Sequence, residues 1–249
     1  MITIDELLRI AKERKASDLH ITVGIPPKIR VNGELIGLEL PKVLPRDAEE
    51  MIAPLFTERA RAIFEEKGEV DFAYAIPGVG RYRVNVFRQR GSYALVIRLV
   101  GTIIPTPEEL GIPERVLDLV DKKRGLILVT GPTGSGKSTT LATLIDLINS
   151  KHNLHIITLE DPIEYLHNHR HSVVNQREIG IDSMSYAGAL RAALREDPDV
   201  ILVGEMRDLD TISIAITAAE TGHLVLSTLH TTGAANTINR VIDVFPPHQ

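Results

Sequence analysis

The sequence contains no cysteine and no tryptophan, and only 4% of its residues are aromatic. The absence of cysteine excludes disulfides, thiolate zinc sites and cysteine nucleophiles. No apolar run approaches the ~20 residues of a membrane-spanning helix, and Met1 leads into a charged segment without the apolar core of a signal peptide. We therefore expect a soluble chain that stays inside the cell.

The composition is that of a globular protein. Of the 249 residues, 43% are hydrophobic and 24% are charged, which argues against disorder and against a fibrous repeat. The length allows one large domain or two ordinary ones. The first 100 residues carry 16 basic and 14 acidic side chains and the remainder 12 and 19, within a net charge of -5. This asymmetry suggests two modules.

The first hundred residues show the patterns of a small α+β domain. Thr3 and Glu6 form a capping-box pattern at the start of a helix. Asn32-Gly33, between two apolar stretches, predicts a tight hairpin turn. Helical patterns lie near 46–67, and alternating strand patterns lie at 70–76, 81–88 and 93–99. We predict a mostly antiparallel domain over residues 1–100.

The pattern changes after residues 101–107, a segment with two prolines and no periodicity that we interpret as a linker. Thr106 to Glu109 then predicts the start of a helix with proline at its first position. Continuous apolar runs lie at 126–129, 156–159, 200–203 and 224–226, and helical stretches lie at 137–149, 185–195, 208–221 and 234–244. Continuous apolar strands indicate burial on both faces, so we predict an α/β domain over 108–249 with a predominantly parallel sheet between helices.

The strongest motif is GPTGSGKS at 131–138, which fits G-x-x-x-x-G-K-[ST] between a predicted strand and a predicted helix. Its glycines let backbone N–H groups converge on phosphate oxygens, and the helix N-terminus adds its positive end. We expect Lys137 to reach the β and γ phosphates of a nucleotide and the Ser138 hydroxyl to hold Mg²⁺. The predicted nucleotide-binding residues are Gly131, Pro132, Thr133, Gly134, Ser135, Gly136, Lys137, Ser138 and Thr139.

Acidic residues follow two of the apolar runs. Glu205 ends the segment DVILVGE, in which Gly204 stands where an Asp is common beside a phosphate-binding loop. We expect Glu205 to serve Mg²⁺, through a water molecule. The second group is EDPIE at 160–164, and the two groups can divide metal binding and general-base catalysis between them. Either group alone could also be a helix-capping or surface carboxylate.

The histidines divide into three cases. His230 follows the last predicted strand at the same sheet edge and could sense the γ phosphate, whereas we expect His223 to be structural. His167, His169 and His171 alternate as metal ligands on one strand face would, but they lack a fourth partner and an apolar setting. We interpret them as an exposed loop and expect no metal there.

Five arginines crowd a stretch without acidic residues, from Tyr74 to Val100. Three interpretations compete: a solvated strand face, a nucleic-acid surface, or arginines that reach the nucleotide of a neighbouring subunit. The pI of 6.0 and the few aromatics fit a nucleic-acid surface poorly, and the negative charge of the other half favours the third interpretation. These residues are Arg81, Arg83, Arg88, Arg90 and Arg98.

These motifs together resemble the secretion ATPase superfamily, and most closely its type IV pilus retraction ATPases, over essentially the whole chain. The supporting segments are ASDLH at 16–20, GRYRVNVFRQRG at 80–91, GPTGSGKSTTLA at 131–142, TLEDPIEY at 158–165, VNQREIG at 174–180, ALREDPDVILVGEMRD at 193–208 and TGHLVLSTLHT at 221–231. The resemblance implies a PAS-like N-terminal domain and a RecA-like ATPase domain, assembled as a homo-hexameric ring that binds ATP and Mg²⁺.

The resemblance also implies roles for individual residues. Glu164 matches the catalytic base, Glu205 matches the Walker B residue, and Arg81 and Arg98 match arginines that contact the nucleotide. Lys137 and His230 complete the predicted catalytic set, and Ser138 and Glu205 are the predicted magnesium ligands.

The implied function is a motor that drives pilus retraction and twitching motility. It would act on an inner-membrane platform protein from the cytoplasmic face, as a peripheral protein and without nucleic acid. Assembly ATPases usually carry an extra N-terminal domain and a four-cysteine zinc motif, so the early ASDLH and the lack of cysteine favour retraction. A pilus-assembly or type II secretion ATPase, a nucleic-acid translocase and a nucleotide-binding regulatory subunit without turnover remain alternatives. The family continues beyond residues 244–247 into a helical region, which we expect to be missing from these 249 residues.

Overall fold

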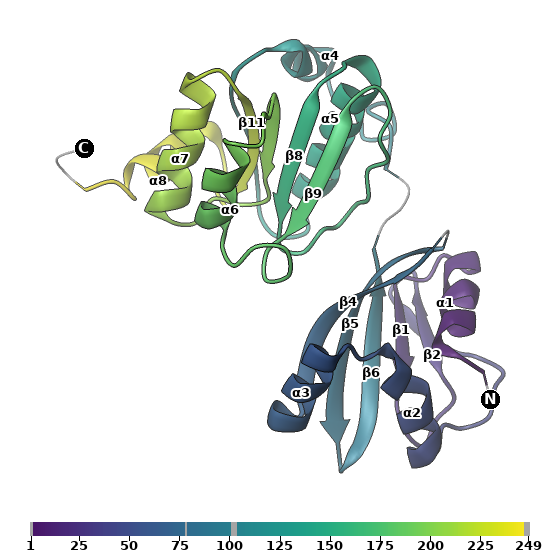
Figure 1. Cartoon of the computed structure of the whole chain (residues 1–249). Helices are drawn as coiled ribbons and strands as arrows, with labels where there is room; N and C mark the ends of the chain where they lie inside the picture. Colours follow the sequence, from purple (N-terminus) through teal and green to yellow (C-terminus); the bar gives the residue numbers. More distant parts are fainter. Residues whose placement is uncertain (1, 78, 101–103, 247–249) are drawn as a thin grey trace. The chain divides into compact units, whose positions relative to one another are not determined.

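The computed structural model describes residues 2–77, 79–100 and 104–246, and the chain divides into two compact units, Met1–Val100 and Gly101–Gln249 (Figure 1). The first three residues of the predicted linker lie outside the described residues. Within the described part of the chain, no helix is long and apolar enough to cross a membrane.

The first unit is an antiparallel sheet of six strands in the order β3-β2-β1-β6-β5-β4. Its elements are α1 (Ile4–Glu13), β1 (Asp18–Ile21), β2 (Lys28–Val31), β3 (Glu34–Gly37), α2 (Pro45–Ile52), η1 (Ala53–Leu55), α3 (Glu58–Lys67), β4 (Glu69–Ile76), β5 (Gly80–Gln89) and β6 (Ser92–Leu99). A single core joins the three α-helices to alternate residues of the strands, so one face of the sheet is covered. The predicted antiparallel α+β architecture is confirmed.

Local sequence signals explain several of these elements. The Thr3 hydroxyl accepts a hydrogen bond from the Glu6 amide, and the Glu6 carboxylate accepts one from the Thr3 amide, which completes the predicted capping box. Asn32 and Gly33 have φ values of 50° and 86°, as a two-residue hairpin turn requires. The predicted helical region 46–67 is divided in two, because Pro54 cannot donate to the α-helical ladder.

The second unit is a parallel sheet of five strands in the order β7-β11-β10-β8-β9. Its elements are α4 (Glu114–Leu117), η2 (Asp118–Asp121), β7 (Gly125–Thr130), α5 (Lys137–Lys151), β8 (His155–Glu160), β9 (Val173–Glu178), α6 (Tyr186–Ala193), β10 (Val200–Val203), α7 (Leu209–Glu220), β11 (Leu224–Leu229) and α8 (Ala234–Ile242). Figure 1 shows α5 on one side of the sheet and α6 and α7 on the other.

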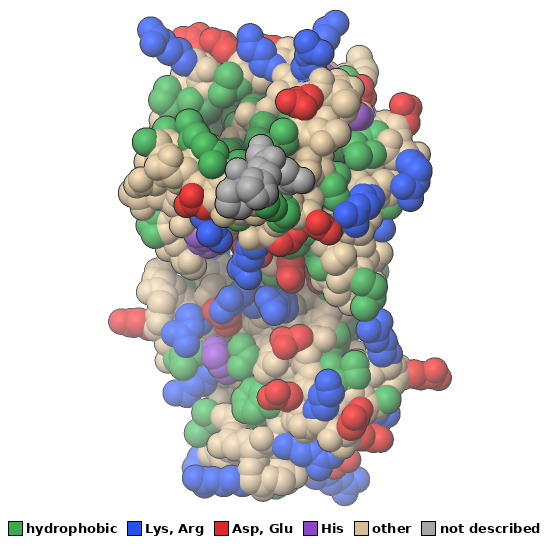
Figure 2. Space-filling view, turned by 90° about the vertical axis from the view of Figure 1, so that its left-hand side faces the viewer, with side chains coloured by type: hydrophobic (Ala, Val, Ile, Leu, Met, Phe, Trp, Pro, Cys, Tyr) green, Lys and Arg blue, Asp and Glu red, His purple; other side chains and the backbone are tan. Residues whose placement is uncertain are grey.

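Two separate cores account for this layering. One joins α5 to one face of the sheet, and the other joins α6 and α7 to the opposite face. The strands are therefore buried on both sides, which confirms the predicted α/β class with a parallel sheet. On the face of this unit that carries α7 and α8, Figure 2 shows hydrophobic side chains among charged ones; Ile238 and Ile242 of α8 are each 60% exposed.

One sequence prediction about this unit was wrong, and one strand was not anticipated. Thr106 and Glu109 exchange the capping hydrogen bonds, but only a turn follows, because Ile112 precedes Pro113 and is disfavoured in helical conformation. Helix α4 begins at Glu114 instead. The edge strand β9 was not predicted, since Val173 and Val174 are its only apolar residues.

Candidate active site

The loop at 131–136 connects β7 to α5, as the motif predicts. Gly131, Gly134 and Gly136 have φ values of 154°, 79° and 88°, which a residue with a side chain rarely adopts. A Cβ added to Gly131 would lie 2.6 Å from the Oγ of Ser135. The glycines thus make a tight loop possible in which the chain turns directly into the helix.

The start of α5 has the features expected of an anion site. Gly136 is the N-cap residue and supplies no side-chain acceptor to the first helical amides. The side chain of Lys137 is buried, and its Nζ donates a hydrogen bond of 3.0 Å to the carbonyl of Pro132. The amides, the helix dipole and the lysine therefore place positive charge at one point.

Acidic residues converge on the same edge because the strands are parallel. Glu160 ends β8, Asp161 and Glu164 follow it, and Glu205 lies two residues beyond β10. They share a cavity of about 350 Å³ with the phosphate-binding loop. The described lining residues are Thr133, Gly134, Gly136, Lys137, Ser138, Thr139, Leu141, Glu160, Asp161, Pro162, Glu164, Tyr186, Leu202, Gly204, Glu205, Thr228 and His230. All of them belong to the second unit.

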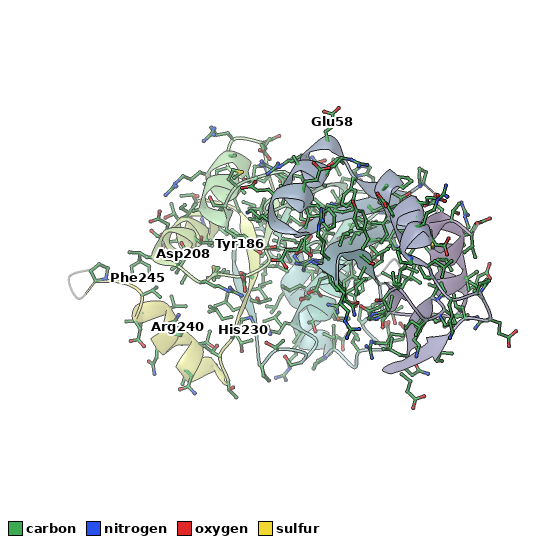
Figure 3. The ribbon with its side chains drawn as sticks, turned by 90° about the horizontal axis from the view of Figure 1, so that it is seen from below. Glu58, Tyr186, Asp208, His230, Arg240 and Phe245 are labelled. Atoms are coloured by element: carbon green, nitrogen blue, oxygen red, sulfur yellow. The ribbon has the colours of Figure 1, made fainter. Side chains whose placement is uncertain are left out.

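Glu205 already has an arginine and a histidine near it in its own chain. Its carboxylate lies 2.7 Å from the Nε of Arg207 and 3.8 Å from the Nε2 of His230. The structure thus brings His230 beside one of the predicted magnesium ligands. Figure 3 labels His230, which follows β11, and Tyr186, which starts α6. His223 donates through Nδ1 to the carbonyl of Ala218 at 3.0 Å, a local contact outside the cavity lining.

Glu160 is the most constrained of the four carboxylates. Its Oε1 accepts hydrogen bonds from Thr158 at 2.6 Å and from Gln176 of β9 at 3.2 Å. Burial raises the pKa of Glu160, and these hydrogen bonds offset only part of that effect. Sequence reasoning treated this residue only as part of the acidic group. Its position at the end of a predicted strand was the sequence signal that could have placed it in the cavity.

The sequence did not predict that two tyrosines lie near the loop. The hydroxyls of Tyr165 and Thr139 are 3.1 Å apart, so the motif TLEDPIEY contacts the first turn of α5 through its final residue. Tyr186 reaches the cavity from the N-terminus of α6. Burial and then the negative charges of Glu205 and its neighbours raise the pKa of Tyr186. A lone aromatic at a helix start carried no sequence signal for this role.

The alternating histidines are not all exposed. His167 is half-buried, and burial lowers its pKa to about 4, whereas His169 and His171 are exposed. The expectation of an exposed loop was therefore wrong for His167. Its Nδ1 is buried and has no hydrogen-bond partner among the residues that the structure describes. Among the described residues there is no group of three or more His, Asp or Glu side chains arranged to hold a metal ion.

The predicted arginines belong to the first unit and lie on strands β5 and β6 or the turn between them. Arg98 donates through Nε to Asp18 at 3.0 Å, and Arg30 approaches the same carboxylate at 3.8 Å. The register aligns these residues with Arg83 in one row across four strands. Arg88 instead lies over the ring of Phe64. The 8% exposure of the Asp18 side chain was not anticipated from the motif ASDLH.

Comparison with known proteins gives consistent matches. The family described as "Type II/IV secretion system protein" matches residues 81–245. The type IV pilus retraction ATPase PilT of Pseudomonas aeruginosa is 51% identical over 246 residues, which cover 99% of this chain and 72% of that protein. A twitching motility protein of Neisseria gonorrhoeae is 49% identical over 244 residues, covering 98% of this chain and 65% of that protein.

Solved structures of ATPases are also similar to this chain. The crystal structure of the pilus retraction motor PilT with bound ADP matches with a TM-score of 0.94 and 53% identity, covering 100% of this chain and 73% of that chain. The ATPase DotB of Legionella pneumophila matches with a TM-score of 0.80 and 32% identity, covering 98% of this chain and 71% of that chain.

Proposed function

Because the chain belongs to the type II/IV secretion system protein family and has the fold of its PilT-like ATPases, we propose that it hydrolyses ATP to drive retraction of type IV pili. The same reaction would power the twitching motility for which the Neisseria gonorrhoeae relative is named. In this proposal the 249 residues hydrolyse ATP as part of a motor.

One observation carries this proposal. The phosphate-binding loop and the ends of β8 and β10 line a single cavity of about 350 Å³, which is a volume typical of small-molecule sites. Parallel strands with a crossover helix bring these segments to one edge, where ligands of α/β folds bind. The arrangement supports phosphoryl transfer to water because it combines a phosphate cradle with acidic groups.

The loop would bind the phosphate tail. Backbone N–H groups at the N-terminus of α5 would donate to the anion, and the buried Lys137 would add its charge beside them. On binding, Lys137 exchanges its hydrogen bond to Pro132 for the β and γ phosphates. Preorganised donors of this kind stabilise charge that develops in the transition state.

The donor set fits Mg²⁺. Ser138 offers a hydroxyl oxygen and Glu205 a carboxylate oxygen, and hard oxygen donors are the ligands this ion prefers. Since the described side chains form no complete metal site, phosphate and water oxygens would supply the remaining ligands. When bound, Mg²⁺ neutralises charge on the β and γ phosphates.

Glu164 is the proposed base. It is exposed at the cavity and forms no ion pair with another described residue, so its carboxylate is available to accept a proton from the attacking water. His230, at 3.8 Å from Glu205, is suited to couple the γ phosphate to that carboxylate.

The charge of the cavity supports a multimeric motor. Its described lining carries four carboxylates and one lysine, and Arg207 pairs with Glu205, so arginines of another copy would add to the compensation that Lys137 and Mg²⁺ supply to a bound triphosphate. We propose that Arg81 and Arg98 of a neighbouring copy are these arginines in a homo-hexamer, with Asp18 holding Arg98 in position.

The proposed partner is an inner-membrane pilus platform protein, contacted from the cytoplasmic face. The retraction ATPases among the relatives support this assignment. The net charge of -5 does not favour nucleic acid, which binds through basic stripes.

Substitution of the loop lysine tests the proposed function. Lys137→Ala should abolish ATP hydrolysis, because the charge on the β and γ phosphates is then uncompensated. Phosphate release by the purified full chain, at concentrations that permit ring formation, is the measurement. Lys151→Ala, at the exposed end of the same helix, is the matched control and should retain turnover. Normal turnover by Lys137→Ala would refute the assignment.

A further inference from the structure

The end of β10 has no room for a side chain. A Cβ added to Gly204 would lie 2.9 Å from the Oη of Tyr186, 3.2 Å from the carbonyl oxygen of Leu159 and 3.4 Å from the Cα of Glu160. The φ of Gly204 is not in the left-handed region, so conformation does not demand glycine there. Space, and not backbone conformation, disfavours a larger residue.

The backbone of Gly204 cannot easily move away. Its amide donates to the carbonyl of Leu159 at 2.7 Å, and its own carbonyl accepts the Thr228 hydroxyl at 2.6 Å. These bonds tie the residue to the neighbouring strands on both sides. The two hydrogen bonds therefore fix the position of the Gly204 backbone next to Tyr186.

Tyr186 is also held in place. It is the first residue of α6, where the Ser185 hydroxyl accepts from the amide of Gly188. Its ring packs against the core that joins α6 and α7 to the sheet, while the residue lines the nucleotide cavity with Glu160, Asp161 and Glu205. The phenol hydroxyl thus projects from an apolar anchor into an acidic site.

The position beside Glu205 is the one at which phosphate-loop enzymes commonly carry an aspartate that serves Mg²⁺. We propose that the Tyr186 hydroxyl occupies the space of that missing carboxylate and acts as the positioning residue for the Glu205 carboxylate and the water between it and Mg²⁺. This inference rests on the proposed ATPase function. Gly204 is required because Tyr186 fills the volume that its side chain would need.

A tyrosine hydroxyl in place of the usual aspartate suits this acidic cavity. Carboxylates only accept hydrogen bonds when ionised, whereas a phenol both donates and accepts. A hydroxyl can therefore donate to a carboxylate or its water without adding to the charge of the four acidic residues. An aspartate at 204 would add a fifth negative charge beside Glu205.

The first experiment measures how far Mg²⁺ strengthens ADP binding, by titration calorimetry with and without the metal. Tyr186→Phe should reduce this strengthening by about tenfold, the usual loss when a residue that orients a metal ligand is removed. Its ADP affinity in EDTA and its melting temperature should stay those of the unchanged protein. Tyr74→Phe, which removes a phenol bonded to Asp5 in the first unit, is the control and should leave the Mg²⁺ dependence of ADP binding unchanged.

The outcomes separate the two proposals. If the unchanged protein does not bind ADP at all, the proposed function fails. If it binds ADP with a Mg²⁺ dependence that Tyr186→Phe leaves intact, only the positioning role is wrong. A loss of ADP affinity in EDTA with a lower melting temperature would mean that Tyr186 is merely structural, which also overturns the inference.

The second experiment tests the shared volume. Gly204→Ala should lower the melting temperature by about 4 °C because of the contact with Oη, and combining it with Tyr186→Phe should restore roughly half of the loss. The contact with Leu159 explains why recovery stays incomplete. Equal losses in the two backgrounds would contradict the spatial part of the inference.

Discussion

The two units handle charge in opposite ways. In the first, the antiparallel register sets Arg30, Asp18, Arg98 and Arg83 side by side on the sheet face that carries no core, so basic and acidic groups meet across strands. In the second, both faces are buried, and charged groups gather at the carboxyl ends of the strands. Antiparallel pairing thus sets opposite charges beside one another, whereas parallel topology gathers acidic residues at one edge.

This contrast has a functional meaning. An acidic cavity that must hold a triphosphate needs cations, and the first unit presents arginines that carboxylates such as Asp18 hold by hydrogen bonds. An arginine of this sheet could pair with a carboxylate of its own sheet or serve the nucleotide of a neighbouring copy. Variants that keep the charge but change the side-chain geometry, or the reverse, distinguish these two roles.

Glu164→Gln should have the largest effect on the acidic edge. The amide cannot accept the proton of the attacking water, so turnover should fall by up to about 10,000-fold while ATP still binds. Calorimetry with ATP and Mg²⁺ and phosphate release are the two measurements. Glu220→Gln, at the exposed end of α7, should leave both unchanged. Loss of ATP binding would demote Glu164 to a structural role.

Arg98→Lys should have the next largest effect. Lysine keeps the charge beside Asp18 but cannot reproduce the planar guanidinium, so turnover should fall by about 1,000-fold if the arginine serves a neighbouring nucleotide. Arg83→Lys is the matched control on the next strand, since Arg83 lies 3.9 Å from the exposed Asp71. Unchanged turnover in both variants would leave the arginine row with a purely local role.

Asp18→Asn should have a smaller effect, on the stability of the first unit. Burial alone would raise the pKa of Asp18, but hydrogen bonds from Ser17 and Arg98 and the charge of Arg98 lower it below 3.8. Removing the charge should cost about 2 kcal/mol, measured by hydrogen exchange of the β1 and β6 amides in the full chain.

The pH dependence of that cost follows from the lowered pKa. Because the folded state holds the carboxylate ionised more strongly than the unfolded state, the stabilisation is fully present above about pH 4 and is lost as the pH falls through the folded pKa. The difference between the two proteins should shrink in the same window. Asp71→Asn, a carboxylate that is 58% exposed, should show no comparable cost.

Much of the fold could be predicted because its signals are local. The capping box at Thr3, the hairpin at Asn32-Gly33 and four of the five parallel strands follow from residues close in sequence. Strand β9 could not be predicted, because it is an edge strand whose polar residues pair only with β8. The burial of His167 likewise depends on packing that no local pattern encodes.

The sequence by itself determined the phosphate-binding loop and the acidic strand ends, because glycine conformation and strand burial are properties of a few consecutive residues. Only the tertiary structure decided that Tyr186 fills the space beside Gly204, that Gln176 reaches Glu160, and that Asp18 is buried between two arginines. These contacts join residues that are distant in the chain, and some of them depend on the register between neighbouring strands. Side-chain volume and strand order therefore complete the site that the motifs begin.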